Sequence, residues 1–193
     1  MFYYKCKMNI FVLSRNPKEA AEQHCDKHVI KMILETTQLL YHCWAFLNED
    51  NWRPLIEMEL SLNTTMISMK EAGQTVNFNT YKSGKGHMNH PCSKWVRESA
   101  ENYKWLCELG LHLCDEKIHR WPNNKQHSCL GHLEVLSKNI PRKLPMIPLT
   151  RFALAMPDEY KQDSVTESYR MYYIMDKQNI LKWTNKERPV WIK

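Results

Sequence analysis

Polar residues that can do chemistry are concentrated in one segment near the start of this chain. On an α-helix with about 100° per residue, six of them fall within roughly 40° of one line. This polar stripe consists of His24, His28, Lys31, Glu35, Gln38 and His42. The rest of the circumference is mostly apolar, so we expect the helix to be embedded in the core, with only the polar stripe facing a pocket.

Lys31 and Glu35 are the two residues of the stripe with the clearest chemical use. A lysine flanked by histidines and apolar walls loses proton affinity, which makes it a nucleophile or a proton donor near neutral pH. Glu35 lies one turn further on and can hold Lys31 by an ion pair or act as a general acid/base. His28 can contact phosphate or shuttle protons. We predict Lys31, Glu35 and His28 as catalytic; a buried polar network that only fixes the helix orientation is the alternative.

Two sets of residues raise the question of a metal ion. His24 and His28 have the spacing of zinc-binding helices, but Cys25 stands where the glutamate of an H-E-x-x-H motif would be. A second set matches no standard zinc-finger spacing and is a weak candidate. Its members are His119, His127, Cys129 and His132. We predict no metal site and no cofactor.

The C-terminal end is basic and aromatic. In residues 177–193 five lysines and arginines stand against the single acid Glu187, although the whole chain carries only +6. Such an end favours a polyanionic partner, of which nucleic acid is the commonest, and a solvated charged end is the alternative. We predict DNA as the partner, with phosphates held by basic side chains and bases stacked on tryptophans. The predicted substrate or DNA contacts are His24, Lys27, Gln38, His90, Lys94, Arg97, Lys182, Trp183, Lys186, Arg188 and Trp191.

The elements that must position these residues are mostly helices. Asn16 is a plausible N-cap with Pro17 at the first helical position, and Gly73 is expected to end a later helix. Apolar periodicity predicts helices over residues 17–47, 54–69, 91–118, 132–136 and 163–183, with a possible turn over 151–156. Residues 8–13 read as an extended buried segment, and 74–90 as a loop or small hairpin. The predicted fold is mainly α: a single helical domain over 1–193, with an N-terminal extension (1–7) and a basic aromatic tail (177–193).

The composition excludes several classes of protein. Hydrophobic residues make up 43% and charged residues 25% of the chain, which is ordinary for a globular protein. No apolar run approaches the roughly 20 residues that cross a bilayer, and no signal peptide is recognisable. The seven cysteines are scattered without a Cys-x-x-Cys pair, which indicates free buried thiols. We expect an intracellular, reducing location, namely host cytoplasm or nucleus if the protein is viral, and no membrane.

Three stretches resemble a known family. The segment NIFVLSRNPKEAAEQHCDKHVIKM resembles the N-terminal segment and first helix of pyrimidine dimer DNA glycosylases of the endonuclease V type. The ending RPVWIK is similar to their basic aromatic C-terminus, and the helix opened by His90 and Pro91 is similar to their central helix. The sequence stretches HCDKHVIKMILE, NHPC and AMPDEYK also resemble a group of uncharacterised proteins from phages and large DNA viruses.

This resemblance implies a mechanism from which the chain departs. Endonuclease V enzymes attack with the free α-amino group exposed by loss of the first methionine, and their first helix carries a catalytic glutamate. The comparable start here is Asn9 after Met8, which seven residues precede, and Lys31 stands at the position of the glutamate. The chemistry is either absent or rebuilt, with Lys31 as the Schiff-base amine and Glu35 as its acid/base partner.

The predicted function is a DNA-binding enzyme acting on a damaged or modified pyrimidine, by glycosylase/lyase-like or base-modifying chemistry. A non-catalytic DNA-binding phage or viral protein is the first alternative. A nucleotide-processing enzyme is the second, because a net charge of +6 is sufficient for a small anionic substrate.

Overall fold

Helices account for the regular structure of this protein. The computed structural model describes residues 9–74 and 87–192, which contain α-helices and no strand. The helices are α1 (Pro17–Gln23), α2 (Asp26–Leu47), α3 (Trp52–Leu62), α4 (Thr64–Glu71), α5 (Pro91–Val96), α6 (Ala100–Arg120), α7 (Leu130–Lys138) and α8 (Val165–Asp176), and the short 3-10 turns η3 (Asp158–Tyr160) and η4 (Gln178–Ile180) flank α8. The predicted mainly α fold is confirmed for these residues.

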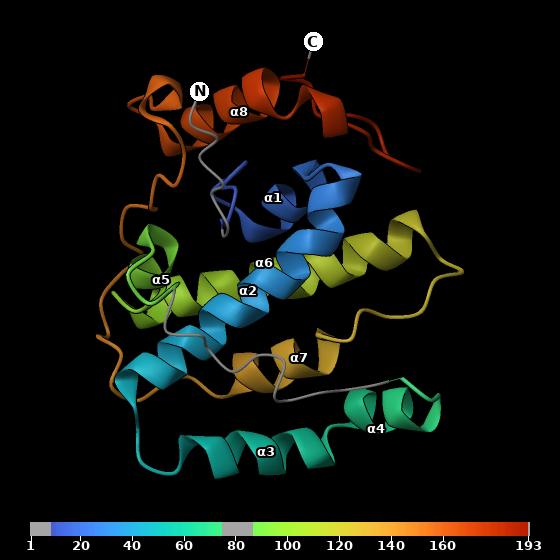
Figure 1. Ribbon diagram of the computed structural model, residues 1–193, viewed down its shortest axis with the longest axis vertical. Coiled ribbons are helices and arrows are strands. Elements are labelled where there is room, and N and C mark those ends of the chain that lie inside the picture. The colour runs from blue at the N-terminus through green and yellow to red at the C-terminus, as the bar shows by residue number, and fades with distance from the viewer. Residues whose placement is uncertain (1–8, 75–86, 193) are drawn as a thin grey trace.

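The long helices α2 and α6 form the centre of the molecule (Figure 1). Helix α7, with α3 and α4 beyond it, covers one side, and α8 with the C-terminal segment covers the other. Helix α6 approaches its neighbours closely at Gly110, where an added Cβ would lie 2.7 Å from Leu133 of α7 and 2.9 Å from Thr36 of α2. A glycine is therefore needed where the three helices meet, and one continuous buried core joins all the layers.

The first predicted helix, over residues 17–47, is in fact two helices. Asn16 caps α1 as predicted, through bonds to the backbone N–H groups of Lys18 and Glu19. The chain then leaves helical geometry at His24 (ψ 138°) and Cys25 (ψ 160°), so α1 ends and α2 begins in a new direction. The carbonyl oxygen of His24 accepts a hydrogen bond from Arg120 of α6. A distant side chain thus stabilises the break, and no local periodicity could reveal it.

Two more predicted helices are also interrupted. The helix over 54–69 is divided into α3 and α4 at Asn63, whose side chain caps α4 by accepting from the Met66 N–H. The helix over 91–118 is divided into α5 and α6, with Ser99 capping α6 through the Asn102 N–H. Gly73 follows α4 with φ of +70°, as expected for a glycine that ends a helix. Local capping residues explain both breaks.

The remaining expectations fare unevenly. The helix predicted over 132–136 is the longer α7, and the one over 163–183 stops at Asp176, so the tail from residue 177 is mostly irregular. Residues 151–156 contain no helical turn, and the Ala155 carbonyl accepts a hydrogen bond from the Asn9 side chain. Residues 9–13 are buried, as predicted, but they are not extended throughout, because the chain turns at Phe11. The predicted extension (1–7) and most of the predicted loop or hairpin (75–86) lie outside the described residues.

Two expectations from composition can be compared with the structure. Six cysteines of the described segments are buried free thiols, as predicted. Within residues 9–74 and 87–192, no helix combines the length and apolar character that crossing a bilayer requires.

Candidate active site

The carboxylate of Glu35 contacts two nitrogens, the backbone nitrogen of Asn9 and the side-chain nitrogen of Lys31. The sequence alone had predicted only the contact with Lys31. Its Oε2 accepts a hydrogen bond from the backbone N–H of Asn9 at 2.9 Å, and its Oε1 lies 3.0 Å from Nζ of Lys31. Asn9 and Glu35 are buried, whereas the Lys31 side chain is 55% exposed. The site therefore has an enclosed side at Asn9 and an open side at Lys31.

Several contacts hold the nitrogen of Asn9 against Glu35. The Asn9 side chain donates from Nδ2 to the carbonyl of Ala155 at 2.8 Å, and its Oδ1 accepts from the N–H of Ile10 at 2.8 Å. Two residues later Phe11 has φ of 38°, in the left-handed region that costs a bulky residue free energy. This turn lets the Phe11 ring stack on His28, with ring centroids 4.3 Å apart. Packing of the ring offsets the strain and fixes the segment that carries Asn9.

The environment of Glu35 suits acid/base chemistry. Burial raises the pKa of this carboxyl group, while attraction to Lys31 and the hydrogen bonds from Lys31 and the Asn9 amide oppose the rise. His87 also opposes it. A carboxyl group with opposing influences of this kind can take up and release a proton at a neighbouring nitrogen.

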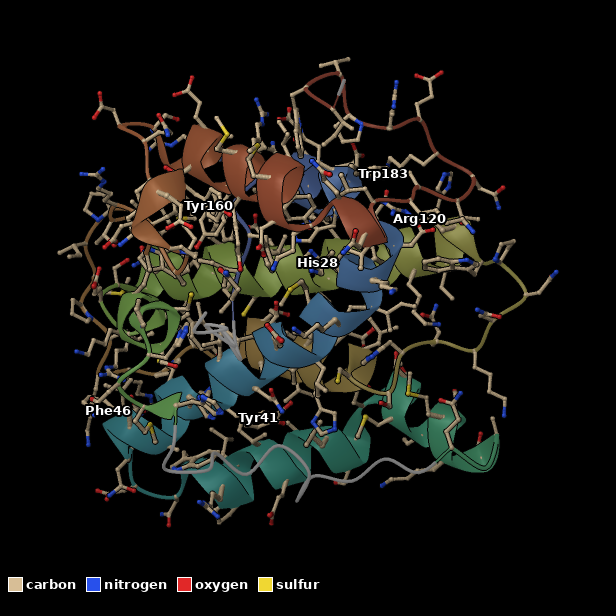
Figure 2. All side chains as sticks on the ribbon, turned by 45° about the horizontal axis from the view of Figure 1, so that its top comes forward. His28, Tyr41, Phe46, Arg120, Tyr160 and Trp183 are labelled. Atoms are coloured by element: carbon tan, nitrogen blue, oxygen red, sulfur yellow. The ribbon has the colours of Figure 1, made fainter. Side chains whose placement is uncertain are left out.

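His28 and His24, the first two members of the stripe, lie in the interior. Nδ1 of His28 forms a 2.5 Å hydrogen bond with the Tyr173 hydroxyl of α8, and Figure 2 shows His28 between α2 and α8. Burial, with smaller contributions from His24 and Lys31, lowers the pKa of His28 to about 2. His24 is fully buried, donates from Nδ1 to the Ala20 carbonyl, and has its pKa lowered to about 4, chiefly by burial. Both rings are neutral at neutral pH, and their contacts favour a structural role.

The far half of the stripe meets two further histidines. His42 stacks on His87, with ring centroids 6.0 Å apart and an interplanar angle of 16°. Nδ1 of His90 accepts from the Cys92 N–H and so caps α5. Burial, followed by the neighbouring His87 and His90, lowers the pKa of His42 to about 4. Gln38 is half-buried between Glu35 and His42 on α2. The structure thus brings His87, which was not among the predicted residues, close to His42 of the stripe and to the predicted contact His90.

The predicted basic contacts outside the tail fall into two kinds. Lys27 of α2 and Lys94 of α5 are exposed. Arg97 is half-buried, donates from Nη1 to the Met88 carbonyl at 2.6 Å, and lies over the ring of Phe46.

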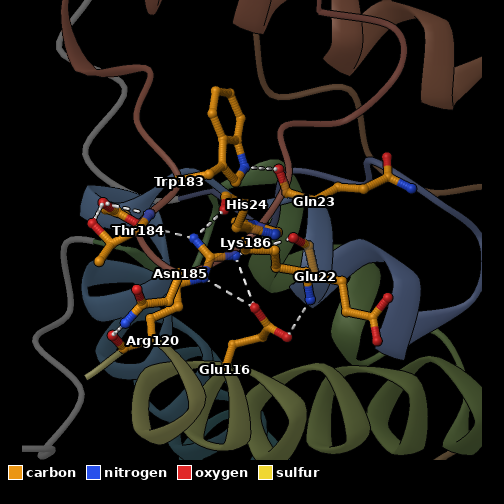
Figure 3. A network of polar contacts seen from close by, with 10 residues as sticks. Glu22, Gln23, His24, Glu116, Arg120, Trp183, Thr184, Asn185 and Lys186 are labelled. Atoms are coloured by element: carbon orange, nitrogen blue, oxygen red, sulfur yellow. Dashed lines mark hydrogen bonds and ion pairs between the residues drawn. The ribbon is translucent and has the colours of Figure 1, made fainter. Parts of the chain in front are cut away.

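The tail is packed onto the protein rather than extended from it. The indole N–H of Trp183 donates to the Gln23 carbonyl at 3.1 Å, and that of Trp191 donates to the Gln23 side chain at 2.8 Å. Lys186 forms a 2.6 Å ion pair with Glu116 (Figure 3). Lys182 and Arg188 are exposed. Of the predicted tail contacts, only these last two present an uncommitted charge in the described structure.

The tail packs where α1, α2 and α6 meet, around a residue that sequence reasoning missed. Arg120 is fully buried and donates to Glu116 of its own helix, to Asp26 of α2, and to the carbonyls of Glu22 and His24 (Figure 3). Asp26 in turn accepts from the backbone and side chain of Thr184 in the tail. The only local signal was Glu116 four residues before Arg120, a spacing also common on exposed helix faces.

The weak metal candidates are not brought together by the fold. His132 forms a hydrogen bond with the Tyr41 hydroxyl, and Nδ1 of His127 accepts from the Cys129 N–H. His119 is exposed. Among the residues that the structure describes, no group of three or more histidine, cysteine or acidic side chains is placed to hold a metal ion.

The fold and site define a helical protein in which a buried carboxylate holds a backbone nitrogen near the N-terminal side of the chain. The chain belongs to the pyrimidine dimer DNA glycosylase family, whose model matches residues 8–128. No curated protein and no solved structure matches it. At the level of the family, the expectation of an enzyme that acts on damaged DNA is confirmed.

Proposed function

We propose that this protein is a DNA glycosylase and lyase that acts on pyrimidine dimers, with Glu35 as its acid/base and the nitrogen of Asn9 as its nucleophile. The observation that carries this proposal is the 2.9 Å contact between Asn9 N and Glu35 Oε2. The family match supports it, because the matched residues begin at Met8, directly before Asn9.

The chemistry follows from placing an amine beside a carboxylate. A free amine at Asn9 attacks C1′ of the damaged nucleotide, so the N–C1′ bond forms as the bond to the base breaks. The base leaves with the bonding electron pair and takes up the proton that the nitrogen loses. The second N–H proton then passes to the sugar oxygen O4′ as the ring opens and the C=N bond forms. In this proposal Glu35 carries both protons, which its 2.9 Å contact with the Asn9 nitrogen supports.

This mechanism requires a form of the protein that begins at Asn9, because an amide nitrogen is not nucleophilic. In a chain that continues before Asn9, the nitrogen of Asn9 is an amide, and the amine that contacts Glu35 is that of Lys31. Its Nζ lies 3.0 Å from Oε1 of Glu35. The two routes share one carboxylate and differ in the nitrogen. Our prediction of Lys31 as the Schiff-base amine therefore stays a rival proposal, with an electrostatic role for Lys31 as the alternative.

Borohydride trapping on a duplex with one pyrimidine dimer distinguishes the routes. Borohydride reduces the imine to a stable covalent adduct, so we expect adducts from a form released by proteolysis to begin at Asn9, and none from the full chain. Lys31→Ala and Lys31→Arg should both keep the adduct if Asn9 is the nucleophile. Loss of the adduct in both variants, with the form starting at Asn9, would instead assign the reaction to Lys31, because arginine keeps the charge but cannot form the imine.

Substitution of Glu35 tests the carboxylate itself. Glu35→Gln should lower single-turnover dimer cleavage by roughly 10²–10⁴-fold, which is the usual contribution of a general acid/base, while binding to the same duplex persists. The matched control is Glu101→Gln, which removes an exposed ion pair to Lys104 on α6. Full activity of Glu35→Gln would contradict the role of Glu35 as general acid/base.

The other expectations of the sequence belong with this proposal. A non-catalytic DNA-binding protein would retain dimer duplex without any adduct, and a nucleotide-processing enzyme would lack the steep salt dependence of DNA binding. The phage or viral relation rests on the sequence stretches HCDKHVIKMILE, NHPC and AMPDEYK. A reducing, intracellular location is supported by the buried free thiols.

A further inference from the structure

Phe46 and Arg97 form an exposed pair at the far end of α2. Phe46 is 51% exposed, which is unusual for a phenylalanine on a helix whose side chains are mostly buried. The guanidinium carbon of Arg97 lies 3.7 Å from the centroid of its ring. One nitrogen of Arg97, Nη1, donates to the Met88 carbonyl at 2.6 Å. The guanidinium thus lies over an aromatic face, and among the described residues only one of its N–H groups has an acceptor.

Arg97 has no direct ionic contact in the described structure, although the Glu98 carboxylate attracts its charge from a distance. Arg97 has no ion pair with any described carboxylate. The adjacent Glu98 accepts from the Thr150 hydroxyl, and the nearby Cys43 thiol stays neutral because burial raises its pKa. Burial also lowers the pKa of Arg97, yet a guanidinium remains charged in proteins. A partly desolvated cation without a direct ion pair is costly, so the pair is suited to an anion from outside.

The position of the pair relates this anion to the candidate active site. Phe46 continues the polar stripe of α2, eleven residues beyond Glu35. At 1.5 Å per residue the separation along the helix is about 16 Å, which is about five nucleotides at 3.4 Å per phosphate along one strand. His42 and His90, on the same face, lie between the two ends.

We propose that Arg97, held by Phe46, binds one backbone phosphate of the substrate strand about five nucleotides from the lesion at Glu35. This inference rests on the proposed function, since it takes DNA as the substrate. The contact positions the strand and carries no information about sequence. Its role is to place the damaged nucleotide by anchoring the strand at a second point along α2.

The test is a scan in which single phosphates of a dimer-containing duplex are replaced by uncharged methylphosphonates. With the wild-type protein, one replacement four to six nucleotides from the dimer should weaken binding by about tenfold, as expected for a lost charge-assisted hydrogen bond. Arg97→Gln should bind the unmodified duplex about tenfold more weakly and lose its sensitivity at that phosphate only. Phe46→Leu should show a smaller change of the same kind.

Arg53→Gln is the matched control. Arg53 also lies over an aromatic ring, that of Trp52, at 5.1 Å. Trp52 stacks on Trp44, which is on the side of α2 opposite the stripe, so Arg53 should leave both affinity and the phosphate profile unchanged. Arg97→Lys keeps the charge without the planar fork, and should restore part of the sensitivity.

An Arg97→Gln protein that keeps the wild-type sensitivity at every phosphate would overturn the inference. Such a result leaves the proposed function intact if the Arg97→Gln protein, released by proteolysis to begin at Asn9, still forms the borohydride adduct. Absence of the adduct from the wild-type form that begins at Asn9 would instead contradict the proposed roles of Glu35 and Asn9 and would say nothing about Arg97. If Arg97→Gln instead reduced the sensitivity to methylphosphonate replacement equally at every phosphate, that would also contradict a single contact. Such a result indicates a diffuse electrostatic effect.

Discussion

Two arginines at helix ends, Arg120 as the last residue of α6 and Arg97 directly after α5, differ sharply in their surroundings. Arg120 is 0% exposed, and its guanidinium donates to two carboxylates and two backbone carbonyls. Arg97 is half-buried, donates to one carbonyl and otherwise rests on the face of Phe46. In the sequence each arginine has an acid close by, Glu116 four residues before Arg120 and Glu98 directly after Arg97, so neighbouring residues do not show which arginine is buried.

The difference indicates which charges are available to a ligand. A buried cation whose donors are all used is part of the framework, and around Arg120 that framework joins α1, α2, α6 and the tail. A partly desolvated cation without a direct ion pair is instead suited to an external anion. The same distinction separates Lys186, paired with Glu116, from the exposed Lys182.

Removing each arginine should affect stability very unequally. Arg120→Met leaves the buried carboxylates of Asp26 and Glu116 without their partner, so we expect the free energy of unfolding to fall by about 3–5 kcal/mol. Arg97→Met should lower it by less than about 1 kcal/mol, because it breaks no ion pair. Urea denaturation at pH 7 measures both. Equal losses of unfolding free energy in the two variants would contradict a structural role for Arg120 that Arg97 lacks.

The junction of α1, α2, α6 and the tail around Arg120 also contains His24. Because of this residue, the free energy of unfolding should fall in acid. Burial lowers the pKa of this ring from 6.5 to about 4, so the unfolded chain binds the proton first. The stabilisation is complete above pH 6.5 and is lost as pH falls toward 4. Between pH 6.5 and 5 this amounts to about 2 kcal/mol for one histidine.

His24→Asn tests this contribution, since asparagine can still donate to the Ala20 carbonyl but does not titrate. The free energy of unfolding of the variant should depend less steeply on pH, by up to about 1.4 kcal/mol per pH unit below pH 6.5. Measurements at pH 8, where both proteins have a neutral side chain here, provide the reference. A slope identical to that of the wild type would show that His24 is not buried as a neutral ring.

The smallest expected effects concern single lysines of the tail. Lys186→Gln should lower the free energy of unfolding by about 1 kcal/mol, because it leaves Glu116 Oε1 without its partner. Lys182→Gln should leave stability unchanged and reduce the salt slope of DNA binding by about 0.9, the value for one phosphate contact. Arg188→Gln should behave like Lys182→Gln.

Denaturation and salt titration of the same three proteins measure these effects. If Lys186→Gln altered only the salt slope, its ion pair would be broken in the DNA complex and the tail would move on binding. In that case Lys186, which pairs with Glu116 in this structure, would contact DNA in the complex.

Periodicity predicted the helical character of the chain well, and the boundaries of its helices poorly. The amphipathic patterns of α3, α6 and α7 and the caps at Asn16 and Pro17 are local, so they could be read directly. The break after α1 could not, because the residues at 24 and 25 carry no glycine or proline signal. Their extended geometry depends on Arg120, nearly a hundred residues away.

The candidate site divides in the same way. The sequence by itself determined that Lys31 and Glu35 share a helix face one turn apart, since that spacing is a property of any α-helix. Only the tertiary structure decided that Asn9 reaches Glu35, that His24 and His28 are turned inward, and that Arg97 lacks an acidic partner. The physical reason is that each of these depends on contacts between segments far apart in the chain, whose geometry is set by packing of the whole core and not by local spacing.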